Sequence, residues 1–317
     1  MKYTNRDNIP PLYAQAIIKK SEKYSRGDAD ISTTGIIDSI LQHILKEKHH
    51  DEIVVDVSDL VYSFWGTCAH QVLDDVDDPS VIFKEKRMYV EVSGMTISGQ
   101  PDIYYKRSTR KVLNDFKTPS KKALEKGVKI EYEKQLNVYK YITVENGYPV
   151  DDLELTAFIR DSRSYEKKIL TFPVKQYKHH KILEYLKKRV ALLKLYKSGI
   201  LANIPECTPV ERWQDTTVYS VMKEGNKKQT GKDCATRQQA ERIVKYHKDK
   251  HPKNNYFVKT KFGTNKRCES WCDVSKFCWW WNLPEGERPD THNQVIEGVV
   301  INDMSKTTSQ ILKELKG

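Results

Sequence analysis

The sequence predicts an α/β protein in which a mixed central sheet is flanked by helices. Two β-rich stretches, 97–105 and 111–116, are joined by the polar segment KRSTR, a pattern typical of a hairpin. Apolar residues recur at helical spacing on either side of these stretches, at 36–44 and again within 177–201. Clustered cysteines close to the C-terminal end indicate an additional subdomain that holds a metal.

The first part of the chain is predicted to be mainly helical. Residues 1–30 are polar and rich in lysine, which favours a partly ordered arm. Thr33 or Thr34 can cap the first helix, because isoleucines and leucines then follow at helical spacing. A second helix is expected to carry His70 near its start.

The strands of the central sheet are expected over 82–92 and 97–116. A helix containing YEKQLNVYKYI then precedes a further strand, LELTAFIRD, and the long amphipathic helix of 177–201 closes this part. These elements belong to one predicted core domain, residues 31–206.

Residues 207–288 are predicted to form a cysteine-bound metal subdomain that contains a small inserted α+β module, 213–262. In the module we expect a hairpin that turns at Gly225 and Asn226, a helix in TRQQAERIVKYHKDK and a closing strand in NYFVKTKF. A DNA contact, a subunit contact and a purely structural insertion are the alternatives for its role. Residues 289–317 are expected to be a tail that docks on the body or on a partner.

The composition limits the classes of function. The 317 residues suffice for one large or two modest domains, and no run of eighteen apolar residues occurs, which argues against a transmembrane helix. The N-terminal segment has no apolar secretory core, so a cytoplasmic location is expected. The net charge of +11 favours a polyanionic partner such as DNA, because phosphate contacts release counterions.

Asp102, Asp115 and Lys117 are the strongest candidates for chemistry. Residues two apart on a strand face the same side, so Asp115 and Lys117 project together, and the hairpin brings Asp102 towards them. Two carboxylates on one rigid sheet edge can hold a hard divalent cation such as Mg²⁺. A lysine beside that cation can position a water for attack on phosphorus. The pattern therefore predicts metal-assisted cleavage of a phosphodiester.

Two helical segments extend this pattern. Gln135 and Tyr139 lie four residues apart, a spacing that puts both on one helix face, and His70 follows the small segment GTCA. With these residues the chain resembles the PD-(D/E)XK nuclease superfamily, specifically its RecB-like branch. That branch is marked by a helical His, a strand Asp, Asp/Glu-x-Lys and Gln-x-x-x-Tyr, and all four elements occur here in that order.

The resemblance implies a restriction-endonuclease-like core and a role for each matching residue. Asp102 and Asp115 would hold Mg²⁺ or Mn²⁺, with the carbonyl group of Phe116 as a further ligand. His70 would be a metal ligand or a residue of a second metal site. Lys117 would orient the nucleophilic water and stabilise charge on the phosphate.

Three more residues receive roles from the same resemblance. Gln135 would contact the lysine or the DNA backbone. Tyr139 would support that contact, with core packing as its alternative. Glu85 would add a carboxylate to the metal site, in preference to Glu91.

Cys268, Cys272 and Cys278 form the pattern C-x₃-C-x₅-C, which in a chain expected to be cytoplasmic favours metal binding over disulfides. A closed tetrahedral site or a cubane cluster needs a fourth ligand. The remaining cysteines are Cys68, Cys207 and Cys234. Cys207 is favoured because it lies in a proline-bounded loop just before the inserted module. Cys68 is expected to be a small buried residue, and the cysteine inside the module to be incidental.

These cysteines resemble the [4Fe–4S] ligands of RecB-like nucleases in helicase–nuclease complexes and in CRISPR adaptation, where one distant cysteine joins three clustered ones. In this chain the favoured fourth cysteine lies downstream of the nuclease motifs, and the first gap of the cluster is one residue longer. From the resemblance a [4Fe–4S] cluster is expected first. Because of the two departures, a structural Zn²⁺ is the second expectation and reduced structural cysteines are the third.

Together the motifs predict a metal-dependent DNA exonuclease, and their order resembles phage-encoded RecB-like exonucleases, which process DNA ends in recombination or replication. No helicase motif occurs, so we expect a helicase or a single-strand annealing or binding protein as partner. A homo-oligomer would suit processive cleavage. A structure-specific or restriction-type endonuclease and a catalytically silent DNA-binding subunit are the alternatives.

Overall fold

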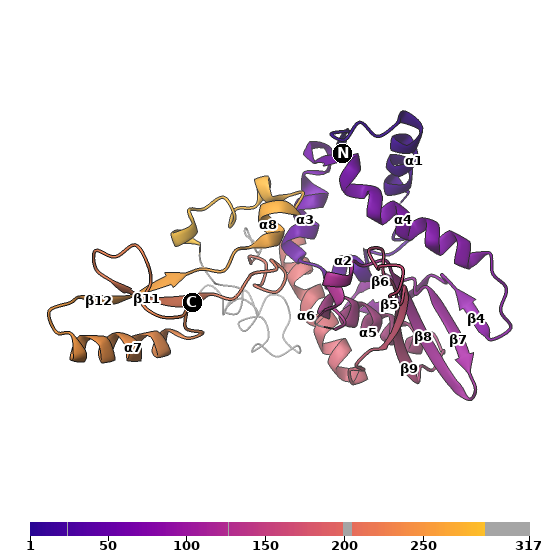
Figure 1. The fold of residues 1–317 in the computed structure, drawn as a ribbon. Helices are drawn as coiled ribbons and strands as arrows, with labels where there is room; N and C mark the ends of the chain where they lie inside the picture. Colours follow the sequence, from indigo (N-terminus) through magenta and orange to yellow (C-terminus); the bar gives the residue numbers. More distant parts are fainter. Residues whose placement is uncertain (24, 126, 199–204, 289–317) are drawn as a thin grey trace. The chain divides into compact units, whose positions relative to one another are not determined.

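The computed structural model describes residues 1–23, 25–125, 127–198 and 205–288 (Figure 1). This part of the chain divides into two compact units, Met1–Glu206 and Cys207–Arg288. The predicted tail, 289–317, lies outside the described residues. Within the described residues, no helix is long and apolar enough to cross a membrane.

A five-stranded sheet forms the centre of the first unit, in the order β10–β9–β8–β7–β4. Its strands are β4 (Val81–Lys84), β7 (Ile103–Arg107), β8 (Arg110–Lys117), β9 (Asp152–Phe158) and β10 (Ile169–Pro173). Strands β8 and β9 run parallel, whereas the other neighbours run antiparallel. The predicted mixed α/β class is therefore confirmed.

The predicted hairpin is present, but its first strand is shorter than expected. Strands β7 and β8 pair as far as Arg107 and Arg110, and Ser108 in the turn has a left-handed φ of 57°. The expected strand 97–105 breaks at Pro101, because proline has no N–H to donate to a sheet ladder. The first part of that stretch is β6 (Met95–Gly99), which belongs to another sheet.

This second sheet has the order β2–β6–β5, with β2 at Ile31–Ser32 and β5 at Met88–Val92. The chain passes from one sheet to the other twice, between β4 and β5 and again between β6 and β7. The two crossings lie opposite each other, because β4 pairs with β7 and β5 pairs with β6. The two crossings form a bent ribbon, in which Glu85 donates a backbone hydrogen bond to the carbonyl of Asp102 at 2.9 Å. Glu85 adopts a φ of 40°, a region that side chains rarely occupy.

The helices described in the first unit are α1 (Pro11–Glu22), α2 (Thr33–Ile37), α3 (Ile40–Lys48), α4 (Val57–Asp74), α5 (Ile130–Glu145) and α6 (His179–Lys197), with 3₁₀ turns at His50–Glu52 and Lys121–Leu124. The first predicted helix is divided into two. Ser32, and neither Thr33 nor Thr34, caps α2 by accepting a hydrogen bond from Gly35 N. Ser39 caps α3 in the same way.

The N-terminal residues form regular elements, where a partly ordered arm was expected. Strand β1 (Lys2–Thr4) pairs in parallel with β3 (Val54–Asp56). Helix α1 packs against α4 in a cluster that includes Ala14, Ile17 and Val57. This cluster is apolar although the segment is polar on average, because Ala14, Ile17 and Ile18 of α1 face it, whereas Leu12 and Tyr13 are exposed.

Helix α4 begins earlier than expected. Its N-cap, Asp56, accepts hydrogen bonds from the Thr4 hydroxyl at 2.6 Å and from the backbone N–H groups of Arg6 and Ser58 at 2.9 and 3.0 Å. The prediction that His70 lies near the start of its helix was wrong, since this residue lies in the last turns of α4.

Helix α5 packs against both sheets. Its residues Leu136 and Ile142 are fully buried. A Cβ atom built on Gly99 of β6 would lie 2.8 Å from Cδ1 of Ile142. A side chain at position 99 would therefore require Ile142 to move.

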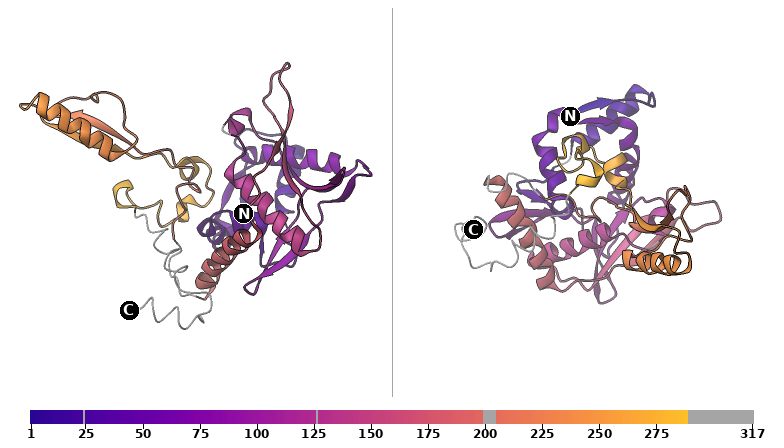
Figure 2. Two further views of the ribbon diagram at one scale, coloured as in Figure 1. Left: turned by 90° about the horizontal axis from the view of Figure 1, so that it is seen from below. Right: turned by 90° about the vertical axis from the view of Figure 1, so that its left-hand side faces the viewer.

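In the second unit, β11 (Val218–Lys223) pairs with β12 (Tyr256–Lys261), and α7 (Arg237–Lys250) packs on one face of this pair (Figure 2). The expected turn at Gly225 and Asn226 leads into a segment that bridges β11 at two points, and β12 provides the full strand partner. Helix α8 (Lys266–Ser270) follows, with 3₁₀ turns at Ser275–Phe277 and Glu285–Glu287.

Candidate metal centre

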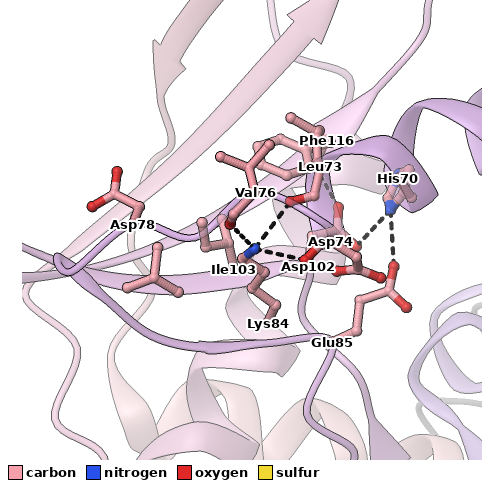
Figure 3. A pocket seen from close by; sticks show the side chains of 11 residues that line it. His70, Leu73, Asp74, Val76, Asp78, Lys84, Glu85, Asp102, Ile103 and Phe116 are labelled. Carbon is pink, nitrogen blue, oxygen red and sulfur yellow. Dashed lines mark hydrogen bonds and ion pairs between the residues drawn. The ribbon is translucent and has the colours of Figure 1, made fainter.

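His70, Glu85 and Asp102 come together at the bend of the ribbon (Figure 3). The Nδ1 atom of His70 lies 3.3 Å from Oε1 of Glu85 and 3.5 Å from Oδ1 of Asp102. One ligand atom from each residue lies within 4.8 Å of the others. A ring nitrogen and carboxylate oxygens at these separations can converge on one divalent cation.

Two polar side chains hold Glu85 in the group. Gln100 donates from Nε2 to Oε2 of Glu85 at 3.3 Å, and Arg87 donates to Oε1 of Gln100 at 2.6 Å. Both come from the two crossings between the sheets. The alternative carboxylate, Glu91, is exposed on β5 and is not part of the group.

Lys84 attaches the end of α4 to β4, which positions His70. Its ammonium group donates to the backbone carbonyls of Leu73 at 3.1 Å and Asp74 at 2.9 Å, and also to that of Val76 (Figure 3). A cation at this place also interacts favourably with the helix dipole. Sequence reasoning missed Lys84, because its partners are backbone carbonyls that carry no signal in the sequence.

Asp115 and Lys117 lie on β8 beside this group. Asp115 is 1% exposed, and its Oδ2 forms an ion pair with the ammonium of Lys117. Oδ1 of Asp115 accepts no hydrogen bond from any described residue. A buried carboxylate oxygen without a donor is costly, and a bound cation would satisfy it.

The carboxylate of Asp102 is tied to β8 through the backbone. Its Oδ2 accepts a hydrogen bond from the N–H of Phe116 at 2.5 Å. The ring of Phe116 also packs edge-on against that of His70, with centroids 5.9 Å apart. Phe116 therefore contacts two residues of the site through its N–H and its ring, and the role of its carbonyl as a metal ligand stays a prediction.

The charges of the site raise two pKa values. Burial, and then the neighbouring carboxylate of Asp115, raise the pKa of Asp102 well above its usual value. Burial lowers the pKa of Lys117, but the attraction of Asp115 and Asp102 outweighs it, so the pKa of Lys117 is raised. The ammonium group therefore stays charged beside two carboxylates. The donor set, the unbonded oxygen and this repulsion between carboxylates fit a divalent cation.

Gln135 and Tyr139 share one face of α5, as the spacing predicts. Gln135 donates from Nε2 to the Tyr139 hydroxyl at 2.9 Å, and Tyr139 is buried in the core cluster. The described residues show no hydrogen bond between Gln135 and Lys117. The α5 residue beside the lysine is Tyr132, whose ring centroid lies 5.7 Å from Nζ of Lys117.

The clustered cysteines lie in the second unit, together with Cys207. Burial, followed by the neighbouring thiols of Cys272 and Cys278, raises the pKa of Cys268 to about 11. The backbone carbonyl of Cys207 accepts a hydrogen bond from Arg212, whose guanidinium lies 4.1 Å from the ring centroid of Trp280. Among the described residues, no three cysteine sulfurs lie within 4.8 Å of one another.

The other cysteines are placed apart from this cluster. Cys234 packs in the core of the inserted module with Val221 and Tyr256. Cys68 lies on α4 in the first unit. No disulfide links the cysteines in the described part of the chain.

No model of a protein family matches the sequence, and no curated protein matches it. Among solved structures, the chain is similar to SSO0001, with 13% identity and a TM-score of 0.45 over 64% of this chain and 88% of that chain. It is also similar to a structure described as "Putative exonuclease" from Eubacterium rectale, with 12% identity and a TM-score of 0.31 over 58% and 74%. Both scores are too low to carry an argument about function.

Proposed function

We propose that this protein is a Mg²⁺- or Mn²⁺-dependent nuclease of the PD-(D/E)XK superfamily, RecB-like branch, that degrades DNA from its ends. The observation that carries the proposal is the convergence of His70, Glu85 and Asp102 beside the buried pair Asp115 and Lys117. Four of these residues match the motifs of the branch, and Glu85 is the further carboxylate that the resemblance implies. The net charge of +11 supports a polyanionic substrate.

His70, Glu85, Asp102 and Asp115 would hold the cation, which when bound polarises a phosphate oxygen and lowers the pKa of a water. Asp102 keeps its orientation through the N–H of Phe116. In the same way, Gln100 keeps Glu85 in place.

Lys117 has two functions in this proposal. Its charged ammonium orients the nucleophilic water and stabilises negative charge that develops on the phosphate. The pair with Asp115 and the ring of Tyr132 limit the positions that the ammonium can take. Gln135 would contact the DNA backbone, and its hydrogen bond to Tyr139 would orient its side chain for that contact.

The remaining parts of the proposal rest on the resemblance. Cys207, Cys268, Cys272 and Cys278 would hold a [4Fe–4S] cluster or Zn²⁺, and the burial of Cys278 and partial burial of Cys268 and Cys272 support such a site. The proposal also includes a phage origin and a cytoplasmic location. As partner it includes a helicase or a single-strand annealing or binding protein, and as assembly a homo-oligomer.

The cysteine site has its own test. Anaerobically purified wild type and Cys272→Ser are compared for iron and zinc content and for visible absorbance, with Cys68→Ser as the matched control. Loss of metal from the first variant alone supports the site and identifies the metal. Equal metal content in all three proteins contradicts it.

The nuclease is tested with end-labelled linear DNA, single- and double-stranded, and with closed circles, in Mg²⁺ or Mn²⁺. The variant Asp102→Asn removes a charge from the site, and Glu91→Gln removes one from an exposed position on β5. We expect wild type and Glu91→Gln to degrade linear DNA and Asp102→Asn to be inactive. Cleavage of circles identifies an endonuclease. Tight binding of DNA without cleavage by the wild type would leave a silent binding subunit.

A further inference from the structure

The inserted module, residues 213–262, carries more than half of the net positive charge. It contains twelve Lys and Arg against five Asp and Glu, a net of +7 out of +11 for the whole chain. Within the described residues, two of the twelve cations form ion pairs with a carboxylate, Arg237 and Lys261. Among the residues that the structure describes, no carboxylate pairs with the other ten, so their charge is available to a polyanion.

The two faces of the β11–β12 pair differ. Tyr219, Val221, Tyr256 and Val258 point towards α7 and pack in the core of the module. The residues between them point the other way, because side chains alternate along a strand. Phe257 and Lys259 therefore lie on the face opposite α7.

One end of this opposite face is closed by polar contacts. Lys261 donates to Gln229 at 2.5 Å and to Asp233 at 3.1 Å, and the hydroxyl of Ser220 bonds to the same aspartate. The other end is open. Phe257 is 45% exposed there, next to Met222 of β11 in the pairing register.

Exposed lysines lie on the same strand as this ring and on the segment that borders Met222. Lys259 lies two residues along β12 on the same face and is exposed. Lys227 and Lys228 are exposed in the segment that enters the sheet beside Met222, where Gln229 forms its bridge. We call Met222, Phe257 and Lys259, with these two lysines, the aromatic–lysine face.

We propose that the aromatic–lysine face binds single-stranded DNA, with a base stacked on Phe257 and phosphates contacted by Lys259, Lys227 and Lys228. An exposed aromatic ring among unpaired cations is the combination that single-strand binding uses. Phenylalanine has no polar group to distinguish one base from another, so binding would tolerate any sequence. A duplex fits less well, because its bases already stack on one another and do not offer their faces.

The choice of DNA as the polyanion rests on the proposed nuclease function, although binding at this face does not require the metal centre. The inference specifies that the substrate of the proposed nuclease is single-stranded DNA, which is bound at a second site on the chain. The opposite side of the module provides an internal control. Tyr246 on α7 is 58% exposed and Lys248 is exposed on the same helix.

The test measures fluorescence anisotropy of a labelled oligothymidine with the full-length chain, without added divalent cation, at several salt concentrations. Phe257→Ala is compared with Tyr246→Ala, and Lys259→Ala with Lys248→Ala. We expect Phe257→Ala to weaken binding by about 5- to 150-fold, the range for one base stacked on an aromatic ring. We expect Tyr246→Ala to change it by less than about twofold on the same scale.

The salt dependence gives a second readout that does not depend on an aromatic substitution in the sheet. Lys259→Ala should make the slope of log Kobs against log[salt] shallower by about 0.7, the value for one phosphate contact on a single strand. Lys248→Ala should leave the slope unchanged. A duplex of the same length should bind more weakly than the single strand and should not respond to Phe257→Ala.

Equal effects of the two aromatic variants, equal slopes for the two lysine variants, or no binding by the wild type would overturn the inference. Cleavage of a short linear substrate is measured in parallel and should be the same in Tyr246→Ala and wild type. Cleavage without face-specific binding would leave the nuclease proposal intact. Face-specific binding without any cleavage would support this inference and contradict the nuclease.

Discussion

Lys84 donates a hydrogen bond from its ammonium to the backbone carbonyl of Asp74 at 2.9 Å, and so joins β4 to the end of α4. This bond links the segment before Glu85 to the helix that carries His70. The separation of two candidate metal ligands is thus set by a lysine that is not itself a ligand. Groups that orient ligands in this way affect metal affinity strongly.

The first prediction concerns this lysine. Lys84→Met should weaken Mn²⁺ binding by about tenfold, because the end of α4 loses its cation and His70 becomes less well positioned. It should also lower the free energy of unfolding by about 1–2 kcal/mol through the lost charge-assisted hydrogen bonds. Calorimetric titration with Mn²⁺ and thermal unfolding measure the two effects. Lys106→Met, an exposed lysine on β7, is the control and should change neither.

A second prediction concerns the buried ion pair. Lys117→Met should destabilise the metal-free protein by about 3 kcal/mol, because it leaves the charge of Asp115 buried without a partner. The double variant Asp115→Asn/Lys117→Met should recover part of that loss. Denaturant unfolding of the two variants measures the difference. Equal stability of the single and double variants would contradict the coupling.

The pH dependence of stability should depend on Asp56. Hydrogen bonds from the hydroxyl groups of Ser58 and Thr4 lower the pKa of Asp56 in the folded chain. A lowered folded pKa contributes stability above the unfolded value of about 3.9, and this contribution is lost as the pH falls through the folded pKa. Asp56→Asn should therefore be less stable than wild type at pH 7 by an amount that shrinks in acid. Unfolding temperatures of both proteins between neutral and acid pH test this.

Asp28→Asn serves as the reference for that experiment, since this aspartate is exposed and makes no hydrogen bond or ion pair with the described residues. Its stability should follow the wild type at every pH. A constant gap between Asp56→Asn and wild type across the range would show that the carboxylate does not titrate with folding.

The close approach of α5 to β6 gives a fourth prediction. Gly99→Ala should lower the free energy of unfolding by about 1–3 kcal/mol, the usual cost of an overfilled core, because its Cβ would lie 2.8 Å from Ile142. Gly286→Ala is the matched control, since nothing lies within 4 Å of a Cβ there. An equal, small effect of both would show that α5 moves away without cost.

Some elements of the fold could be predicted from local sequence patterns, and the structure shows why other elements could not. The β7–β8 hairpin was predictable, because β-rich residues flank a polar turn. The break at Pro101 could have been placed as well, since proline cannot donate in a ladder. The crossing at Glu85 could not, because an unusual φ at a glutamate leaves no mark in the sequence. Helix α4 was misjudged because the residues after Asp56 also suit a strand.

The candidate site shows the same division. Asp115 and Lys117 could be paired from their spacing alone, because alternation on a strand is strict. Glu85 was ranked above Glu91 only through the resemblance, and its position beside His70 depends on the bend of the ribbon. Tyr132 was not predicted, since its contact with Lys117 arises from the packing of α5 on β8, which no local pattern in the sequence indicates.

The bent ribbon fixes the spacing of the two carboxylates through the backbone. Glu85 and Asp102 are hydrogen-bonded partners on opposite strands of the ribbon, where each strand leaves one sheet for the other. A bend of the ribbon would carry both residues together, whereas sliding β4 along β7 would separate them. The coordination geometry is therefore maintained by the register of one strand pair. An insertion or deletion of one residue in β4 would be the most direct way to abolish it.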